Sequence, residues 1–364
     1  MHSDLVIKEQ RVYELIDKLN LSGILLSKQT NFLWFTGGNR NDVIKNEDIS
    51  LVYLFITKDN KYLISTNSDK ERVCNEELDK KGFESIVYDW YCQDVFDALK
   101  KIRITKNIGG DLQHPNILYI ENNLADIRRN LTGDEIKKLR NLADEYSKLL
   151  TKFCLNLKPG LTEKQIANNL ICECLKKDIK MPVLMVGSDE RVFKYRHPVV
   201  TDKKVYKYFI LATVAERSGL NISLSRCVYF GKTPKELNSK IESVNYIEAV
   251  YCCNSLPDKT LKELFEVGKK AYAKAGYPDE WKNHTQGGII GYRPREFIAN
   301  SSSKVKIKSN NALSWNPTIK GVKAEDVILV KEREVEQLTI DKKWPYIEID
   351  INGKQFLKPK ILEI

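Results

Sequence analysis

The stretch HTQGGIIGYRPRE, residues 284–296, combines glycines with polar side chains in a way that few strands do. Gly287, Gly288 and Gly291 surround two isoleucines. Because glycine has no Cβ atom, it lets a backbone approach a ligand or another strand closely. The polar side chains around the glycines are His284, Gln286, Tyr292, Arg293, Arg295 and Glu296. The stretch therefore predicts a strand that lines a site.

The bulk composition is typical of a globular protein with about two domains. The chain has 364 residues, of which 42% are hydrophobic and 30% charged. No apolar run approaches the roughly 20 residues that a membrane span requires. The first ten residues, MHSDLVIKEQ, lack the apolar core of a signal peptide. We therefore expect a cytoplasmic protein without a membrane partner.

The formal net charge of +10 would suit a nucleic-acid or acidic partner. However, Lys and Arg are interleaved with Asp and Glu, as in TPKELNSKIESV and DKTLKELFEVGKK. The sequence has no arginine-rich arm, no aromatic RNA-binding signature and no zinc-finger spacing. These features favour a solvated lysine surface, and we expect no nucleic-acid partner.

Cysteine and histidine are the residues most able to bind a transition metal or react. None of the eight cysteines forms a CxxC pair, and the closest ones, Cys172 with Cys174 and Cys252 with Cys253, fall in helical patterns. This favours buried reduced thiols over a zinc cluster. Imidazole chemistry must come from four histidines, which are His2, His114, His197 and His284.

The first third of the chain alternates helix and strand patterns. Residues 11–20 predict a helix and residues 22–28 a strand, and the runs 50–57 and 61–67 predict a hairpin across the polar turn KDN. A helix over 70–81, a strand over 83–89 and a helix near 122–131 follow. Together they predict a small α/β domain over residues 1–131.

The character of the sequence changes at Thr132. Thr132 and Glu135 have the form of a capping box that opens a long amphipathic helix, and Thr162 and Gln165 form a second box. Strands are expected at 208–216 and 221–231, and helices at about 233–254 and 258–275. The strand-rich remainder contains an Asn-Gly hairpin turn at 352–353. We expect residues 132–364 to form a second domain.

Five ordered motifs resemble the creatinase, prolidase and aminopeptidase P family over nearly the whole chain. They are NFLWFTGG (31–38), YRHPVVTDKKV (195–205), SGLNISLSRCVYFG (218–231), HTQGGIIGYRPRE (284–296) and WNPTIKGVKAEDVILVKEREVEQLT (315–339). The resemblance implies an α/β (α+β) protein with a small N-terminal creatinase-like domain and a C-terminal pita-bread domain of the catalytic type. It also implies a homodimer.

Active peptidases of this family hold two divalent ions with two Asp, one His and two Glu side chains, because such ions need charged oxygen ligands to activate a bridging hydroxide. In the matching motifs, four of these five positions are occupied by Ala212, Ser223, Gly288 and Asn316. Only Glu325 is retained. The resemblance therefore predicts that the metal site is lost and that the protein uses no cofactor.

Creatinase, which shares this fold, hydrolyses a C–N bond without metal. His197, in RHPVV, falls on the position of its catalytic histidine, and an imidazole with a pKa near 6.5 can move protons at neutral pH. A histidine that only hydrogen-bonds a loop is the alternative. Glu325 or Glu296 is expected as a second proton-handling group, especially if burial raises the pKa of Glu325.

Several other residues are expected to bind the substrate. Arg226 and Arg295 suit a carboxylate or phosphate group, because a guanidinium binds such anions with two parallel hydrogen bonds. The alternatives are a structural ion pair for Arg226 and, for Arg295, an ion pair with Glu325 or Glu296 in the vacated metal space. The remaining candidates are His284, Tyr292, Gln286, Trp315 and Asn316.

Two functions remain open. The first is a metal-independent, creatinase-like hydrolase of a C–N bond in a small polar, anionic substrate. The second is a non-catalytic pita-bread homologue that binds a peptide or protein, as the histone-binding chaperone domains of this family do. A metal-dependent Xaa-Pro peptidase would require that the family's metal-ligand motifs align with other residues of this sequence than those given above. Lys320 and Lys323 would favour an anionic ligand if they lie beside the emptied pocket, or else they lie at the surface.

Overall fold

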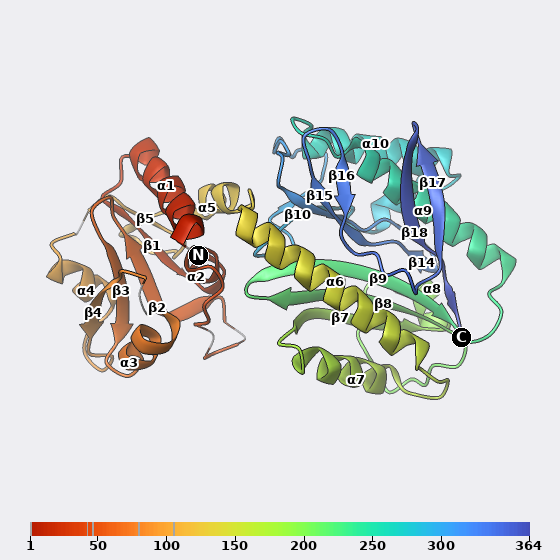
Figure 1. The fold of residues 1–364 in the computed structure, drawn as a ribbon, viewed down its shortest axis with the longest axis horizontal. Helices are drawn as coiled ribbons and strands as arrows, with labels where there is room; N and C mark the ends of the chain where they lie inside the picture. Colours follow the sequence, from red (N-terminus) through yellow and green to blue (C-terminus); the bar gives the residue numbers. More distant parts are fainter. Residues whose placement is uncertain (1, 42, 46, 79–80, 105) are drawn as a thin grey trace. The chain divides into compact units, whose positions relative to one another are not determined.

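The computed structural model describes residues 2–41, 43–45, 47–78, 81–104 and 106–364, in two compact units, Met1–Glu135 and Ile136–Ile364 (Figure 1). Helix α6 (Gly133–Leu155) begins at the predicted capping box. Thr132 N donates to Glu135 Oε2 over 2.8 Å, and Glu135 N donates to Thr132 Oγ1 over 3.3 Å. The second predicted box, Thr162 with Gln165, likewise opens α7 (Glu163–Leu175).

The first unit is built on one mixed sheet in the order β4-β3-β2-β1-β5-β6. The predicted hairpin is confirmed, because β2 (Ile49–Ile56) and β3 (Lys61–Thr66) pair antiparallel. The other strands are β1 (Gly23–Lys28), β4 (Glu84–Tyr88), β5 (Ile108–Gly110) and β6 (Ile117–Tyr119). The helices are α1 (His2–Leu19), α2 (Gln29–Thr36), α4 (Val95–Lys101) and α5 (Glu121–Arg128).

The continuous α-helix expected over 70–81 is wrong. α3 covers only Lys70–Arg72 and is followed by a π-helical turn, Val73–Glu77. Residues 79–80 lie outside the described residues.

The NFLWFTGG motif folds as α2 and is tied to the sheet by a buried polar network. Asn31 Nδ2 donates to Asp111 Oδ2 over 2.7 Å and to Glu121 Oε2 over 2.9 Å. Arg128 donates to Asn31 Oδ1 and forms an ion pair with Glu121. The asparagine of the motif therefore joins α2 to the residue after β5 and to α5, which is a structural role.

The second unit contains two larger sheets. One has the order β19-β9-β8-β7, formed by Leu362–Glu363, Leu220–Tyr229, Tyr208–Arg217 and Lys180–Ser188. The other has the order β11-β10-β12-β15-β16, formed by Phe297–Ile298, Gly287–Ile290, Ala312–Trp315, Asp326–Val330 and Val335–Gln337. Two hairpins complete the strands: β13 (Thr318–Ile319) with β14 (Val322–Lys323), and β17 (Tyr346–Ile351) with β18 (Lys354–Pro359).

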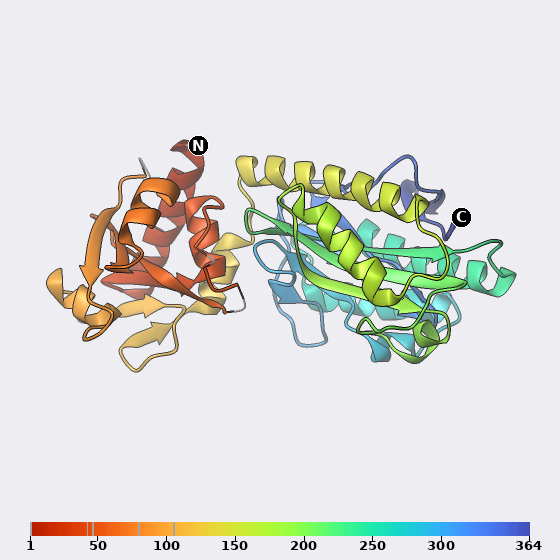
Figure 2. The ribbon, with the colours of Figure 1, turned by 90° about the horizontal axis from the view of Figure 1, so that it is seen from below.

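Helices cover the strands of this unit on both sides. Figures 1 and 2 show α6 and α7 along β7–β9, where Tyr146 Oη of α6 donates to Thr213 Oγ1 of β8 over 2.8 Å. The other side carries α9 (Lys235–Asn254) and α10 (Leu261–Lys274), and the shorter helices are α8 (Glu190–Lys194) and η2 (Glu280–Asn283). Tyr251 of α9 stacks on Trp315 of β12 with ring centroids 4.3 Å apart. The helices and strands predicted for this part of the chain therefore occur in the predicted order, but β7 and α8 were not predicted.

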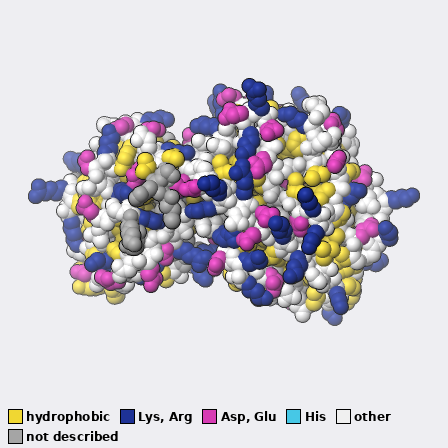
Figure 3. Space-filling model, viewed as in Figure 1, with side chains coloured by type: hydrophobic (Ala, Val, Ile, Leu, Met, Phe, Trp, Pro, Cys, Tyr) yellow, Lys and Arg dark blue, Asp and Glu magenta, His cyan; other side chains and the backbone are white. Residues whose placement is uncertain are grey.

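Charged side chains of both signs are mixed on the surface (Figure 3), and the cysteines are unpaired. Figure 3 shows basic and acidic side chains interspersed on the face it displays. No helix in the described ranges is long and apolar enough to cross a membrane. All eight cysteines are free thiols, but Cys92 and Cys172 are exposed, so the expectation of burial is wrong for these two.

Replacing Gly268 by Ala should destabilise the second unit. An added Cβ would lie 1.8 Å from Tyr251 Oη, and the Tyr251 ring is held by its stack on Trp315. Overpacking of this kind costs about 1–3 kcal/mol, which exceeds the roughly 1 kcal/mol that alanine gains over glycine within a helix. Urea unfolding measures the loss. Gly133→Ala, at an α6 position with no atom within 4 Å of the new Cβ, is the control that should leave stability unchanged or slightly higher.

Candidate functional site

Glu325 is the centre of the candidate site. It lies directly before β15 and is only 4% exposed. Its Oε1 accepts Arg295 Nη2 over 2.9 Å, and its Oε2 lies 3.0 Å from Lys323 Nζ and accepts Ser225 Oγ over 2.8 Å. Arg295 also donates from Nη1 to Ser223 Oγ over 3.3 Å. One carboxylate is thus shared by two cations.

This arrangement sets the charge of Glu325. Burial alone would raise its pKa, but the charges of Lys323 and Arg295, with hydrogen bonds from Lys323 and Ser225, lower it from 4.5 to about 2. Glu325 is therefore ionised at neutral pH. The condition under which Glu325 was expected to handle protons best, a pKa raised by burial, is therefore not met, because the two cations outweigh the cost of burial.

Two of the metal-ligand positions lie on one face of the β8–β9 hairpin. Ala212 pairs directly with Ser225, and Ser223 pairs with Val214 two residues further along. Residues two apart on a strand share a face, so Ala212, Ser223 and Ser225 lie together. All three are buried. This face offers a methyl group at Ala212 and a hydroxyl group at Ser223 where the peptidase motif has two carboxylates.

A third position, Gly288, cannot carry a ligand side chain in this backbone. Its φ of +152° is a conformation that L-residues rarely adopt, and an added Cβ would lie 2.1 Å from the carbonyl oxygen of Phe297. The preceding Gly287 has a φ of +106° and an equally close contact with the carbonyl of Ser314. The glycines therefore serve the close pairing of β10 with β11 and β12.

The fourth position, Asn316, follows β12. It is buried, its N donates to Gln286 O over 3.1 Å, and its Oδ1 has no hydrogen-bond partner among the described residues. No group of three or more His, Cys, Asp or Glu side chains that could hold a metal ion occurs within the described ranges. The residues at this site do not fit two divalent ions: the single carboxylate is ion-paired with Arg295 and Lys323, and Gly288 has no room for a side chain.

The two predicted histidines lie together beside this centre. The rings of His197 and His284 have centroids 4.7 Å apart. Burial and the charge of Lys323 lower the pKa of both, that of His284 to about 3. His284 Nδ1 donates to the carbonyl oxygen of Thr285. Both imidazoles are therefore neutral at pH 7, and His197 is exposed to solvent whereas His284 is buried.

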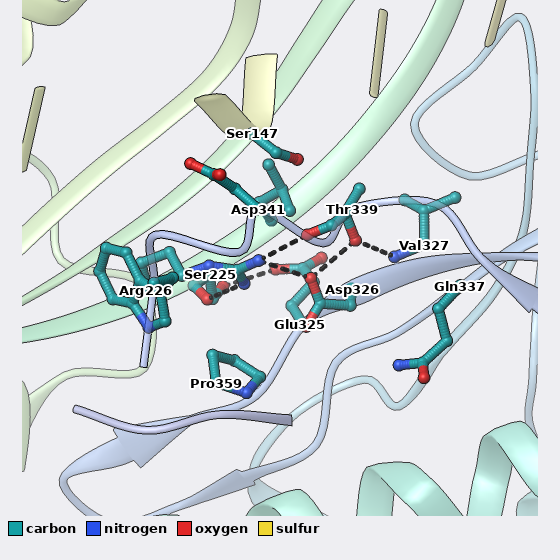
Figure 4. A network of polar contacts seen from close by, with 12 residues as sticks. Ser147, Ser225, Arg226, Glu325, Asp326, Val327, Gln337, Thr339, Asp341 and Pro359 are labelled. Atoms are coloured by element: carbon teal, nitrogen blue, oxygen red, sulfur yellow. Dashed lines mark hydrogen bonds and ion pairs between the residues drawn. The ribbon is translucent and has the colours of Figure 1, made fainter. Parts of the chain in front are cut away.

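Arg226 points away from this cluster into a second polar network (Figure 4). It is buried, and its Nη2 donates to Asp326 Oδ1 over 2.8 Å and to Thr339 O over 3.0 Å, while its Nη1 donates to Ser225 O over 2.9 Å. Thr339 Oγ1 also donates to Asp326 Oδ1 over 2.7 Å. The geometry therefore favours the structural alternative for Arg226 over substrate binding.

Three other candidates also have partners that explain them structurally. Trp315 is fully buried, stacks on Tyr251 and donates from Nε1 to Ser255 Oγ over 2.9 Å. Glu296 Oε1 accepts Tyr292 N over 3.0 Å and so fixes the turn after β10. These contacts place Trp315 in the core and Glu296 and Tyr292 in a turn.

Gln286 Nε2 donates to His284 O over 2.7 Å and to Trp281 O over 3.2 Å, so it positions the segment that carries His284. Lys320 is exposed, as the surface alternative predicts, but that alternative is wrong for Lys323, which is 6% exposed. Ser225 was not among the predicted site residues, although its place two residues from Ser223 on an expected strand was the signal for it.

The pH dependence of stability should reveal the Glu325 cluster. Because its pKa in the folded state lies below the unfolded value, Glu325 contributes stability above pH 4.5 that is lost as the pH falls towards 2. The difference corresponds to roughly 3 kcal/mol at most. Urea unfolding should show that Glu325→Gln loses much of this free energy of unfolding at pH 7. The stability of the variant should also change less than that of the wild type between pH 4.5 and 2. The exposed Glu332→Gln should behave as wild type; equal slopes for all three proteins would contradict the ion-pair assignment.

Comparison with known proteins supports the fold. Residues 9–145 match the creatinase/prolidase N-terminal domain family. The chain is 23% identical over 225 residues to an uncharacterized peptidase of Staphylococcus saprophyticus, a match that covers 59% of this chain and 63% of that protein's length.

Two solved structures resemble the whole chain. A prolidase from Pyrococcus horikoshii superposes with a TM-score of 0.78 at 17% identity, covering 92% of this chain and 98% of that one. The N-terminal domain of FACT complex subunit SPT16 from Cicer arietinum superposes with a TM-score of 0.70 at 13% identity, covering 93% and 98%. The family resemblance and the fold expected from the five motifs are therefore confirmed: the chain joins a creatinase/prolidase N-terminal domain to a C-terminal unit with the pita-bread fold of the prolidases.

Proposed function

We propose that this protein is a metal-independent hydrolase that cleaves a C–N bond in a small anionic substrate. The observation that carries the proposal is the cluster in which two neutral imidazoles, His197 and His284, lie beside two cations that share the Glu325 carboxylate. The relative in Staphylococcus saprophyticus is named a peptidase and a structural neighbour is a prolidase, which supports C–N hydrolysis as the reaction class.

The residues at the site support metal independence. A divalent ion at Glu325 would have to displace Arg295 and Lys323. It would then find Ala212, Ser223, Gly288 and Asn316 in place of charged ligands. A pair of Mn²⁺ or related ions needs several charged carboxylate or neutral imidazole ligands to balance its charge. The two fixed cations supply positive charge at this place instead.

His197 is the group we assign to proton transfer. Its neutral imidazole takes a proton from water as the water oxygen bonds to the substrate carbon, and it returns the proton to the leaving nitrogen as the C–N bond breaks. Glu325 does not share this task, because with a pKa of about 2 it is ionised and held by its partners. Its part is to hold Arg295 and Lys323 in position.

The charge of the cluster favours an anionic substrate. Arg295 and Lys323 carry two positive charges and Glu325 one negative charge, and both histidines are neutral, so the cluster has an excess of one positive charge. The Arg295 side chain is 19% exposed and can reach a ligand from the solvent side. A guanidinium binds a carboxylate well in such a partly buried place.

A second function is favoured by one observation, namely that neither glutamate is free to accept a proton. Glu325 is ion-paired, and Glu296 is bonded to the Tyr292 amide. A non-catalytic homologue that binds a peptide or protein would need no such group. The likeness in fold to a domain of a FACT complex subunit supports this alternative.

Replacing His197 by Ala separates the two functions. The metal-chelated protein is assayed against N-acyl amino acids, dipeptides and ureido acids, with His114→Ala in the other unit as the control. Because a general acid–base group contributes about 10²–10⁴-fold to a rate, His197→Ala should lower kcat by that factor while changing ligand affinity little. The His114→Ala control should retain full activity. Binding without turnover in the wild type would instead support the non-catalytic alternative.

Native mass spectrometry with Mn²⁺ or Zn²⁺ tests metal independence. The expected spectrum is that of a metal-free protein at twice the chain mass, since we also propose a homodimer. A mass increase of two ions per chain would overturn the metal-independent mechanism. A monomer would overturn the proposed assembly alone.

A further inference from the structure

We propose that a cavity beside Lys323 binds a small monovalent anion, either a halide or the carboxylate group of a bound molecule. The cavity has a volume of about 30 Å³ and is lined by Ala212, Thr318, Lys323 and Arg196 among others. It adjoins the Glu325 cluster and shares Lys323 with it, whereas neither Glu325 nor Arg295 is among the residues that line it.

The β13–β14 hairpin places Thr318 and Lys323, two residues that line this cavity, side by side. Thr318 and Lys323 are direct cross-strand partners, so their side chains lie next to each other on the same face. Thr318 is fixed in place because its N donates to Tyr272 Oη over 2.9 Å. Its hydroxyl group is buried and has no hydrogen-bond partner within the described part of the chain. A hydroxyl donor beside a buried ammonium group is a suitable pair for an anion.

The charges around the cavity call for an anion. Among the described residues, Lys323 contacts one carboxylate, that of Glu325, and shares it with Arg295. Arg196 is already paired with Glu280. No Asp or Glu is among the residues that line the cavity in the described ranges. A buried cation without a full counter-charge is costly, so an anion that enters this space gains the attraction of Lys323.

The size of the cavity limits what can bind. A water molecule needs about 10–15 Å³ measured in this way, so the space takes a single small particle or one end of a larger molecule. An intact dipeptide does not fit within about 30 Å³. Ala212 stands where the peptidase motif has Asp, and a carboxylate at this wall would repel an anion. Because position 212 holds Ala and not Asp, the cavity can accept an anion.

The line width of the ³⁵Cl resonance of chloride, measured with the full-length protein, tests the inference. Exchange with a protein site broadens this line, and formate is added as a carboxylate competitor. Lys323→Met removes the ammonium group, whereas Thr318→Val removes only the hydroxyl and keeps the side-chain shape and the ion pairs. Lys320→Met, in the same hairpin but exposed, is the matched control. Circular dichroism establishes that each variant is folded.

Wild type and Lys320→Met should broaden the line equally, Lys323→Met should abolish the effect, and Thr318→Val should weaken chloride affinity about tenfold, as expected for one hydrogen bond to a charged group. If formate narrows the line, the site accepts a carboxylate; if it does not, the site is selective for halides. Absence of broadening in the wild type, or unchanged broadening in both Lys323→Met and Thr318→Val, would overturn the inference. The measurement involves no turnover, so an inactive protein that binds chloride would refute only the hydrolase.

Discussion

The sharing of the Glu325 carboxylate between Arg295 and Lys323 is the interaction on which the second unit depends most. It joins the segment after β10, the end of β14 and, through Ser225, the β8–β9 hairpin. A backbone bond from Ser225 N to Glu325 O, 3.0 Å long, fixes the same crossing. A buried carboxylate with only one of these partners would be costly, because the loss of either cation leaves a poorly compensated charge in the interior.

The alternation of side chains along a strand separates this centre from its neighbour. Glu325 and Ser225 face the site, whereas the next residue on each strand, Asp326 and Arg226, faces the other way and forms the network in Figure 4. Two groups of ion pairs, one beside the cavity and one in the core, thus lie on opposite faces of the same two segments, β9 and the start of β15. The group in the core holds the strands in register while the group beside the cavity determines the charge of the site.

Much of the fold could be predicted from the sequence, because its strongest signals are local. The capping boxes at Thr132 and Thr162 and the Asn352-Gly353 turn depend on residues within a few positions of one another. Short strands were missed, among them β5 and β6, because three residues are too few to show alternation. The strand expected within residues 284–296 is only four residues long, and the positive φ angles of its first two residues, Gly287 and Gly288, cannot be read from the sequence.

The sequence predicted which residues of the candidate site lie together, but it did not predict the direction of the pKa change of Glu325. Motif spacing placed His197, His284, Arg295 and Glu325 together, and the structure brings them together. The direction of the Glu325 pKa change depends on Lys323, whose side chain turns inward from a hairpin too short to recognise in the sequence. Arg226 and Arg295 have the same side-chain chemistry, so the sequence does not distinguish their roles. The structure does, because Arg226 pairs with Asp326 in the core and Arg295 pairs with Glu325 at the site.

Gly288 also limits what sequence change can undo. Restoring an imidazole there would require β10 and β11 to separate, since the Cβ atom of any residue would collide with the Phe297 carbonyl. Neither Ala212 nor Ser223 has a positive φ, so the backbone would accept a carboxylate side chain at either position. By contrast, a histidine at position 288 would require a change of backbone as well as a change of side chain.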